Sequence, residues 1–246
     1  MSETVGVEPL EQHEQSGLSL MTQLDPWREA INVLPVLRRP DGYRVLVVAP
    51  HPDDETLGLG GLIYDWRRAG LDIRVLIVSD GGASHRHAQL ADIRKAEALA
   101  AAEALGMGDR FTFLDLPDGE LLHQRVEIGE AIRAYIPTDG QQCVVLAPRL
   151  RDGHPDHEAC AVAAADVTAS LYGVELWSYG VWTWTQIPQN DSLLGARRWL
   201  ISADGYEAKW KAIALYASQV SAMLGEQIVS DQLLATMDWA TEVVWC

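Results

Sequence analysis

The segment RVLVVAPHPDDETLGLGG, from Arg44 to Gly61, contains the pattern from which the fold class follows. Its first part, Arg44 to Val48, is a continuous apolar run, as in strands that are buried on both faces. A helix is expected directly afterwards, from Leu57 to Ala69, because apolar residues recur there at helical spacing and Gly70 can end it. A buried strand followed at once by a helix predicts the beginning of a βαβ unit.

The same alternation continues along the chain. Strands that alternate with helices of about 10–15 residues predict right-handed βαβ units on a parallel sheet. We therefore expect an α/β fold, a Rossmann-like three-layer sandwich with a mostly parallel sheet of strand order 3-2-1-4-5 and a C-terminal extension. The further strands are expected at Ile73–Val78, Phe111–Leu114, Val144–Leu146 and Glu175–Tyr179, and the further helices at Ala91–Leu105, Gln124–Tyr135, Glu158–Leu171 and Tyr206–Ala217.

The composition excludes several classes of protein. The chain has 246 residues, of which 48% are hydrophobic and 22% charged, and these values do not fit a disordered chain. No apolar run approaches the ~20 residues of a membrane-spanning helix, and the acidic, polar N-terminus is not typical of a secretory signal. A formal net charge of −16 disfavours nucleic acids and anionic membrane surfaces as partners.

The domain organisation and the location follow from similar observations. Residues 1–24 lack periodicity and are expected to form a flexible arm, followed by a single domain over residues 25–246. The cysteines, Cys143, Cys160 and Cys246, are far apart and odd in number, so neither a disulfide framework nor a thiolate metal site is expected. We expect a cytoplasmic protein, and the sequence does not indicate its oligomeric state.

Histidines and carboxylates follow two of the expected strands. In a sheet of order 3-2-1-4-5 the first and fourth strands are neighbours, and ligands bind where their carboxyl ends meet. Two imidazoles and one carboxylate are a ligand set of catalytic zinc, although a redox metal such as Fe(II) uses the same set. Each segment alone is explained as well by helix capping or a surface turn. The residues are His51, Asp53, Asp54 and Glu55 after the first strand, and His154, Asp156 and His157 after the fourth.

These two segments resemble the signatures of the LmbE/PIG-L family, which contains zinc-dependent N-deacetylases of N-acetylglucosamine conjugates and related amino sugars. The similar stretches are APHPDDETLGLGG (Ala49–Gly61) and GHPDHEA (Gly153–Ala159). The pieces SDGGASH, RKAEALAAAEALG and LPDGEL between them are also similar. The resemblance runs from about Arg44 to Ala161 and continues weakly through KWKAIALYASQ.

The resemblance implies a metal centre and a base. It makes His51, Asp54 and His157 the ligands of one Zn²⁺ per chain, with other divalent metals as alternatives. It makes Asp53 the general base that takes a proton from metal-activated water.

The resemblance also implies groups that act on the substrate. His154 becomes the electrophilic or general-acid histidine, with Asp156 orienting it. Arg94 and Asp118 fall where the family contacts its substrate sugar. This chain departs from the pattern at Asp152, where some members have a gating tyrosine.

The implied function is hydrolysis that removes an acetyl group from an N-acetylated amino sugar or its GlcNAc-type conjugate, a small molecule. One alternative is a same-family amidase that cleaves a larger acyl group from a thiol–sugar conjugate. A second is a non-catalytic Rossmann-like binding module, although the G-x-G-x-x-G fingerprint is incomplete at Gly58–Ile63. Trp182 and Trp184 are candidates for an aromatic wall against a sugar ring. The substrate, the leaving acyl group and the native metal stay open.

Overall fold

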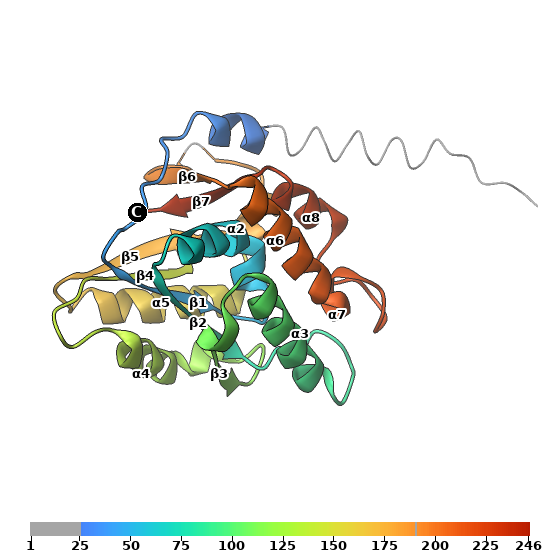
Figure 1. Cartoon of the computed structure of the whole chain (residues 1–246). Helices are drawn as coiled ribbons and strands as arrows, with labels where there is room; N and C mark the ends of the chain where they lie inside the picture. The colour runs from blue at the N-terminus through green and yellow to red at the C-terminus, as the bar shows by residue number, and fades with distance from the viewer. Residues whose placement is uncertain (1–25, 190) are drawn as a thin grey trace, which may run out of the picture.

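A seven-stranded sheet of order β3-β2-β1-β4-β5-β7-β6 forms the centre of the computed structural model, which describes residues 26–189 and 191–246 (Figure 1). The first five strands pair in parallel, whereas β7 pairs antiparallel with both β5 and β6. This arrangement confirms the α/β class, the order 3-2-1-4-5 and the C-terminal extension. The strands are β1 (Arg44–Ala49), β2 (Asp72–Ser79), β3 (Phe111–Leu116), β4 (Cys143–Pro148), β5 (Val174–Tyr179), β6 (Ala196–Leu200) and β7 (Thr241–Trp245).

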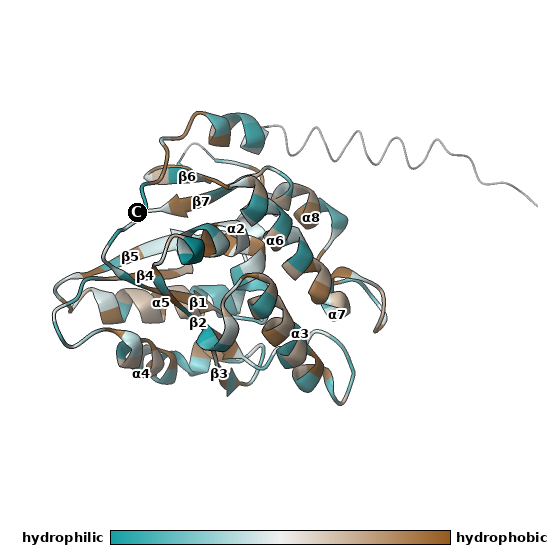
Figure 2. Cartoon of the chain, viewed as in Figure 1, coloured by the Kyte–Doolittle hydropathy of each residue, from teal (hydrophilic) through white to brown (hydrophobic). Residues whose placement is uncertain are grey.

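Helices cover both faces of the sheet and give it two hydrophobic cores. Side chains of β1 alternate between them: Val45 and Val47 face the core under α2, α3 and α6, and Leu46 and Val48 face the core under α4 and α5. Figure 2 shows that these helices carry both apolar and polar residues, as expected for helices with one buried side. The bounds are α2 (Asp54–Arg68), α3 (Leu90–Ala104), α4 (Arg125–Tyr135), α5 (Pro155–Thr168) and α6 (Ala203–Leu215).

Shorter elements complete the fold. A helix over residues 26–32 precedes β1, and the chain then pairs with β6 through a bridge between Val36 and Arg198. The expected flexible arm, residues 1–24, lies outside the described residues. The remaining short helices are η1 (Gly108–Arg110), η2 (Leu121–His123), η3 (Trp182–Thr185), α7 (Ala217–Val220) and α8 (Asp231–Met237).

The two helices that carry the candidate site residues both begin three residues earlier than the periodicity predicts. Helix α2 begins at Asp54 rather than Leu57, and α5 begins at Pro155 rather than Glu158. Acidic residues are favourable in a first helical turn and proline fits its first position, so both polar segments join the helices. The candidate site residues that follow β1 and β4 are therefore placed partly by helix geometry.

The glycines of α2 allow the helix to pack closely against the sheet and the C-terminal extension. A Cβ atom on Gly58 would lie 2.5 Å from the buried ring of Tyr179, and one on Gly61 would lie 2.5 Å from the Ile201 side chain. The close approach leaves no space for side chains at these two positions, so glycine is needed there for α2 to pack against Tyr179 and Ile201.

A buried ion pair fixes the middle of α2 to the C-terminal extension. The Glu242 carboxylate accepts hydrogen bonds from the backbone N–H groups of Gly61 and Leu62, at 2.9 and 2.6 Å. The Lys209 ammonium group donates to the same carboxylate at 2.7 Å, and both charged side chains are buried. Because breaking a buried pair leaves an uncompensated charge, the pair resists separation of β7 from α6, and the two backbone hydrogen bonds hold α2 to the same carboxylate.

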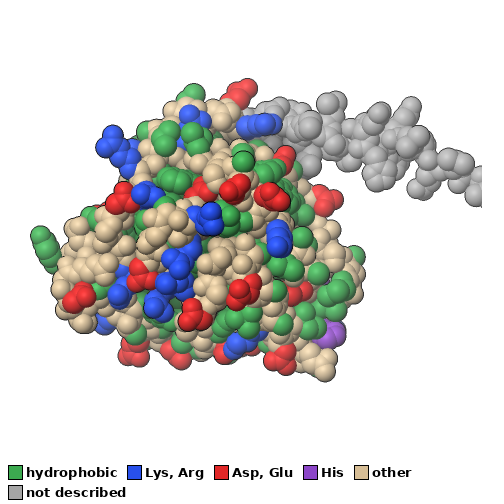
Figure 3. Space-filling view, viewed as in Figure 1, with side chains coloured by type: hydrophobic (Ala, Val, Ile, Leu, Met, Phe, Trp, Pro, Cys, Tyr) green, Lys and Arg blue, Asp and Glu red, His purple; other side chains and the backbone are tan. Residues whose placement is uncertain are grey.

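The surface carries mixed charges. On the face drawn in Figure 3, Asp and Glu side chains are interspersed with Lys and Arg. Within the described part of the chain, none of the helices combines the length and the apolar character that a membrane crossing needs.

Gly58→Ala is expected to lower the free energy of unfolding by about 1–3 kcal/mol, because the added methyl group overlaps the Tyr179 ring. This loss outweighs the ~1 kcal/mol that alanine gains over glycine within a helix. Urea unfolding measures the change in the free energy of unfolding. The matched control is Gly129→Ala in α4, where the nearest atom, on Val167, lies at 3.3 Å and a smaller loss is expected than for Gly58→Ala. Equal losses in both variants would contradict the packing argument.

Candidate active site

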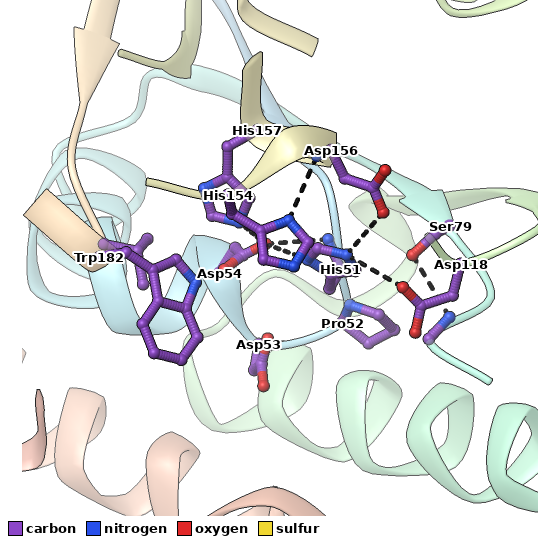
Figure 4. A network of polar contacts seen from close by, with 12 residues as sticks. His51, Pro52, Asp53, Asp54, Ser79, Asp118, His154, Asp156, His157 and Trp182 are labelled. Atoms are coloured by element: carbon purple, nitrogen blue, oxygen red, sulfur yellow. Dashed lines mark hydrogen bonds and ion pairs between the residues drawn. The ribbon is translucent and has the colours of Figure 1, made fainter. Parts of the chain in front are cut away.

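The two polar segments meet at the carboxyl ends of β1 and β4 (Figure 4). The ring centroid of His51 lies 4.8 Å from that of His154 and 5.5 Å from that of His157, and the latter two rings are 5.1 Å apart. The structure thus brings together residues that are about a hundred positions apart in the chain. Two compact sets of ligand-capable atoms occur in this region, His51 with His154 and His157, and His51 with Asp118 and Asp156.

Asp54 lies between two of the imidazoles. Its Oδ2 atom is 3.1 Å from Nδ1 of His51 and 3.2 Å from Nε2 of His157. The same oxygen accepts a hydrogen bond from the backbone N–H of His51 at 2.9 Å. Burial opposes the negative charge, yet the imidazoles of His157 and His51 hold the pKa of Asp54 well below its usual value. Each imidazole nitrogen therefore lies from the Asp54 oxygen at a distance found between neighbouring ligands of one metal ion.

The ring of His157 directs its Nε2 atom to the Asp54 carboxylate. Its Nδ1 atom contacts Oδ2 of Asp152 at 2.7 Å, while its buried Nε2 has no hydrogen-bond partner within residues 26–189 and 191–246. Burial lowers the pKa of an imidazole, but the carboxylates of Asp54 and Asp152 outweigh it and raise the pKa of His157 to about 9. Nε2 therefore favours a positive charge, either a proton or a metal ion. This nitrogen makes no hydrogen bond to the described residues and lies 3.2 Å from Oδ2 of Asp54, an arrangement that fits a metal ligand.

Asp152 is a structural acceptor, and this role was not visible in the sequence. Its fully buried carboxylate accepts hydrogen bonds from the backbone N–H groups of Val181, Trp182 and Thr183, and from the Thr183 hydroxyl. A carboxylate that accepts from an imidazole fixes the orientation of a metal-binding histidine. At the position where some relatives have a gating tyrosine, this chain thus has a group that orients His157.

His51 is held from its other side by two carboxylates. Its Nε2 atom lies 3.1 Å from Oδ1 of Asp118 and 3.2 Å from Oδ2 of Asp156. The Asp156 carboxylate also accepts from the backbone N–H groups of Gly119 and Leu121. Because Nε2 faces these carboxylates, Nδ1 of His51 is the atom that faces Asp54.

The partner of Asp156 differs from the expectation. The resemblance paired the Asp156 side chain with His154, but the carboxylate contacts His51 instead. Only the backbone N–H of Asp156 reaches His154, donating to Nδ1 at 3.2 Å across the first turn of α5. The cause is the helix start at Pro155: His154 takes the N-cap position, and Asp156 lies in the first turn beyond it.

Asp53 has an unusual backbone conformation and a buried carboxylate. Its φ angle of 136° is rare for a residue with a side chain, and such conformations cost roughly 1–3 kcal/mol. Burial raises the pKa of Asp53 to about 7; the Arg94 guanidinium opposes the rise, and the Asp54 carboxylate adds to it. The Arg94 Nη2 atom lies 3.1 Å from Oδ2 of Asp53. Asp53 is thus a carboxyl group that exchanges a proton near neutral pH.

The two expected sugar-contact residues both lie beside the site. Arg94 is 3% exposed and donates to the carbonyl oxygens of Pro52 and Gly81 at 2.7 and 3.2 Å, so most of its guanidinium is used within the protein. Asp118 accepts from the backbone N–H of Ala83 at 3.0 Å. Burial opposes its charge, but the hydrogen bond with His51 lowers the pKa of Asp118 to about 2. Both residues line the cavity described next.

A cavity of about 380 Å³ lies in front of these groups. Its polar side includes Asp53, Asp54 and His154, and its apolar side consists of Leu57, Trp182, Ile228 and Val229. No sequence pattern pointed to Ile228 and Val229, because they belong to an irregular segment. Of the two expected wall tryptophans, Trp182 lines the cavity, whereas Trp184 is buried and packs edge-on against Trp27.

A second cavity of about 540 Å³ adjoins the first. His154 and Trp182 line both cavities. The second is otherwise lined mainly by polar side chains, among them Arg151, Glu158 and Gln186. The site therefore consists of two adjoining cavities that share His154 and Trp182.

A family model supports the assignment that these contacts suggest. The model described as "PIG-L: GlcNAc-PI de-N-acetylase" matches residues 46–168, which is half of the chain. The chain belongs to the PIG-L/LmbE family. The match includes most of β1, all of β4 and all six residues expected to form the metal centre and the catalytic groups.

Similar proteins carry the names of deacetylases. Diacetylchitobiose deacetylase of Thermococcus kodakarensis is 36% identical over 125 residues, covering 48% of this chain and 46% of that protein. The 1D-myo-inositol 2-acetamido-2-deoxy-α-D-glucopyranoside deacetylase of Mycobacterium sp. is 33% identical over 171 residues, covering 58% and 54%. The chain thus spans about half the length of the curated relatives it matches. A conserved protein of Thermus thermophilus has a solved structure with a TM-score of 0.55 at 31% identity, covering 72% of this chain and 80% of that one.

Asp152→Ala is expected to lower the free energy of unfolding of the metal-free protein by about 3–5 kcal/mol, because buried donors around it lose their acceptor. Denaturant unfolding measures the change. Asp166→Ala, on α5 away from the site, is the control and should change the value by less than about 0.5 kcal/mol. If Asp152→Ala were as stable as this control, the orienting role of Asp152 would be wrong.

Proposed function

We propose that this PIG-L/LmbE family member is a zinc-dependent N-deacetylase, a hydrolase that removes the acetyl group from an N-acetylated amino sugar carried on a second group. The observation that carries the proposal is the convergence of His51, Asp54 and His157 next to a separate carboxyl group, Asp53, which lines one cavity together with His51 and Asp54. The names of the curated relatives support the same activity.

The proposed metal ligands are Nδ1 of His51, Oδ2 of Asp54 and Nε2 of His157. Their separations of 3.1 and 3.2 Å from the shared carboxylate resemble the ~3.3 Å between neighbouring ligands of a tetrahedral ion with bonds of about 2.0–2.1 Å. When bound, zinc lowers the pKa of a water molecule and polarises the amide carbonyl. Two nitrogens and one oxygen suit zinc, and His51, Asp54 and His157 would hold it beside the cavity that His51 and Asp54 line.

Asp53 would act as the general base. It is adjacent in sequence to Asp54 but directs its carboxylate to Arg94 and the cavity. A carboxyl group with a pKa of about 7 accepts and returns a proton readily at neutral pH. Asp53 takes a proton from the attacking water while the water oxygen adds to the amide carbon.

His154 would act on the oxygen and the leaving amine. Its Nδ1 accepts the backbone N–H of Asp156, so Nε2 is the nitrogen that can donate to the substrate. A donor aimed at the carbonyl oxygen stabilises the charge that develops on it during attack. The carbon–nitrogen bond then breaks. The amine receives the proton that was taken from the water, and acetate and a free amino sugar leave.

The second cavity favours a conjugate over a free monosaccharide. The names of two curated relatives describe two-ring substrates, a disaccharide in one and an inositol glycoside in the other. In this chain the amino sugar would occupy the first cavity, and a polar ring attached to it would reach Glu158 and Gln186 past Trp182. Hydroxyl groups of such a ring match the acceptors and donors there.

Asp53→Asn is expected to lower kcat for acetate release from N,N′-diacetylchitobiose by about 10²–10⁴, because the amide cannot take the proton of water. Its zinc content, measured by mass spectrometry, should equal that of the wild type, about one ion per chain.

The controls for this test are two histidine variants. His157→Ala should lose both zinc and activity, whereas His123→Ala, at an exposed position, should keep both. Normal turnover by Asp53→Asn would exclude Asp53 as the base, and wild-type zinc in His157→Ala would exclude that ligand. Release of a larger acyl acid from a thiol–sugar conjugate, with no acetate release, would identify the amidase alternative.

The wild-type enzyme is expected to hydrolyse N,N′-diacetylchitobiose with a kcat/KM about ten-fold or more above that for N-acetylglucosamine, because the second ring contributes binding energy. Glu158→Ala should reduce this ratio, and Glu130→Ala, exposed on α4, should not. Steady-state kinetics on both sugars measure it. A ratio near one in the wild type would show that the second cavity does not bind a ring.

A further inference from the structure

The strained backbone of Asp53 needs contacts that hold it. Its φ angle of 136° lies in a region that residues with side chains rarely adopt. Such a conformation persists only where the surrounding structure over-determines it. The carbonyl oxygen of Asp53 accepts from the N–H groups of Thr56 and Leu57, which begin α2, and its own N–H donates to Oε2 of Glu55 at 3.2 Å.

Glu55 lies away from the cavity, although it belongs to the same motif. Its side chain is fully buried, and Oε1 accepts from the Thr56 hydroxyl at 2.6 Å and from the Tyr216 hydroxyl at 2.5 Å. An acidic residue in a first helical turn is usually explained by the helix dipole and solvent. Here the carboxylate instead connects the Asp53 backbone to a residue 161 positions later in the chain.

Tyr216 is a rigid anchor for this connection. It follows α6 and is 1% exposed, and its ring belongs to the hydrophobic core beneath α2 and α6. Thr56, the other donor to Glu55, moves together with α2 because it is part of the same turn. Tyr216 is thus the contact that fixes the Glu55 carboxylate relative to the rest of the protein.

We propose that Glu55 and Tyr216 form a positioning pair that holds Asp53 in its strained conformation, with the carboxylate directed to Arg94 and the cavity. The proposal rests on the proposed function for its kinetic consequence. Neither residue touches the substrate; Tyr216 acts through Glu55, and Glu55 acts through the backbone N–H of Asp53. Loss of the Tyr216 hydroxyl frees the Glu55 carboxylate, and the Asp53 backbone then relaxes away from the geometry that proton transfer needs.

Tyr216→Phe in the zinc-loaded enzyme tests the pair. We expect kcat for acetate release to fall by about ten- to hundred-fold, since misplacement of a reacting group by about 1 Å has effects of this size. KM should change by less than about two-fold, because the substrate contacts remain. The zinc content should remain at the wild-type level. In hydrogen exchange followed by NMR, the Asp53 amide should exchange about ten-fold faster or more, since its acceptor is no longer fixed.

The matched control is Tyr179→Phe. Tyr179 is as buried as Tyr216, and its hydroxyl donates to the carbonyl oxygen of Val48 at 2.9 Å rather than to Glu55. This variant also loses one buried hydroxyl hydrogen bond, but it should keep kcat within about two-fold and leave exchange of the Asp53 amide unchanged. Equal effects of the two variants on kcat and on this amide would overturn the proposal, because a general loss of stability would then explain both.

A double-mutant cycle covers the case in which Tyr216→Phe folds poorly. Glu55→Gln alone should lower kcat by a similar factor, and the double variant should lose little more, since both changes break one connection. Additive losses would overturn the pair. If the wild type releases no acetate, the proposed function fails, but the exchange rate of the Asp53 amide in Tyr216→Phe still decides whether Tyr216 holds Asp53.

Discussion

The carboxylate of Asp54 is buried between His51 and His157, and the surrounding structure keeps both imidazoles beside this charge. A buried charge is costly unless it is paired, so both imidazoles must stay beside it. Each ring is therefore held from behind by further carboxylates, Asp152 for His157, and Asp118 with Asp156 for His51. These carboxylates in turn accept backbone N–H groups, so loops after β2, β3 and β5 are fixed around the site.

The fold and the meeting of the two polar segments could be predicted from the sequence, because both depend on local patterns. Buried parallel strands are continuous apolar runs such as Arg44–Val48, and the order of a doubly wound sheet then places the ends of β1 and β4 side by side. The family signature added roles for single residues. Helix starts were less well predicted, because the polar residues at Asp54 and Pro155 interrupt the apolar periodicity on which the expectation relied.

The contacts behind the site could not be predicted, because they join residues that no local pattern relates. Asp152 finds its partners in residues 181–183, at the start of a short 3₁₀ helix after β5. Glu55 resembles an ordinary acidic residue at a helix start until Tyr216 is placed beside it. The side chain of Asp156 reaches His51 rather than His154 because the first turn of α5 separates the two neighbours in space.

The hydrogen bonds between the backbone of α2 and Glu242 have a consequence for the order in which the chain folds during synthesis. During synthesis the amino-terminal part of a chain emerges first and begins to fold first. The glycines of α2 leave the ribosome well before their acceptor does, since Gly61 and Glu242 are 181 residues apart. Until β7 arrives, the helix that carries Asp54 lacks the carboxylate that accepts from its middle. The middle of the helix that carries Asp54 is therefore completed by a contact that forms only when β7 joins the sheet.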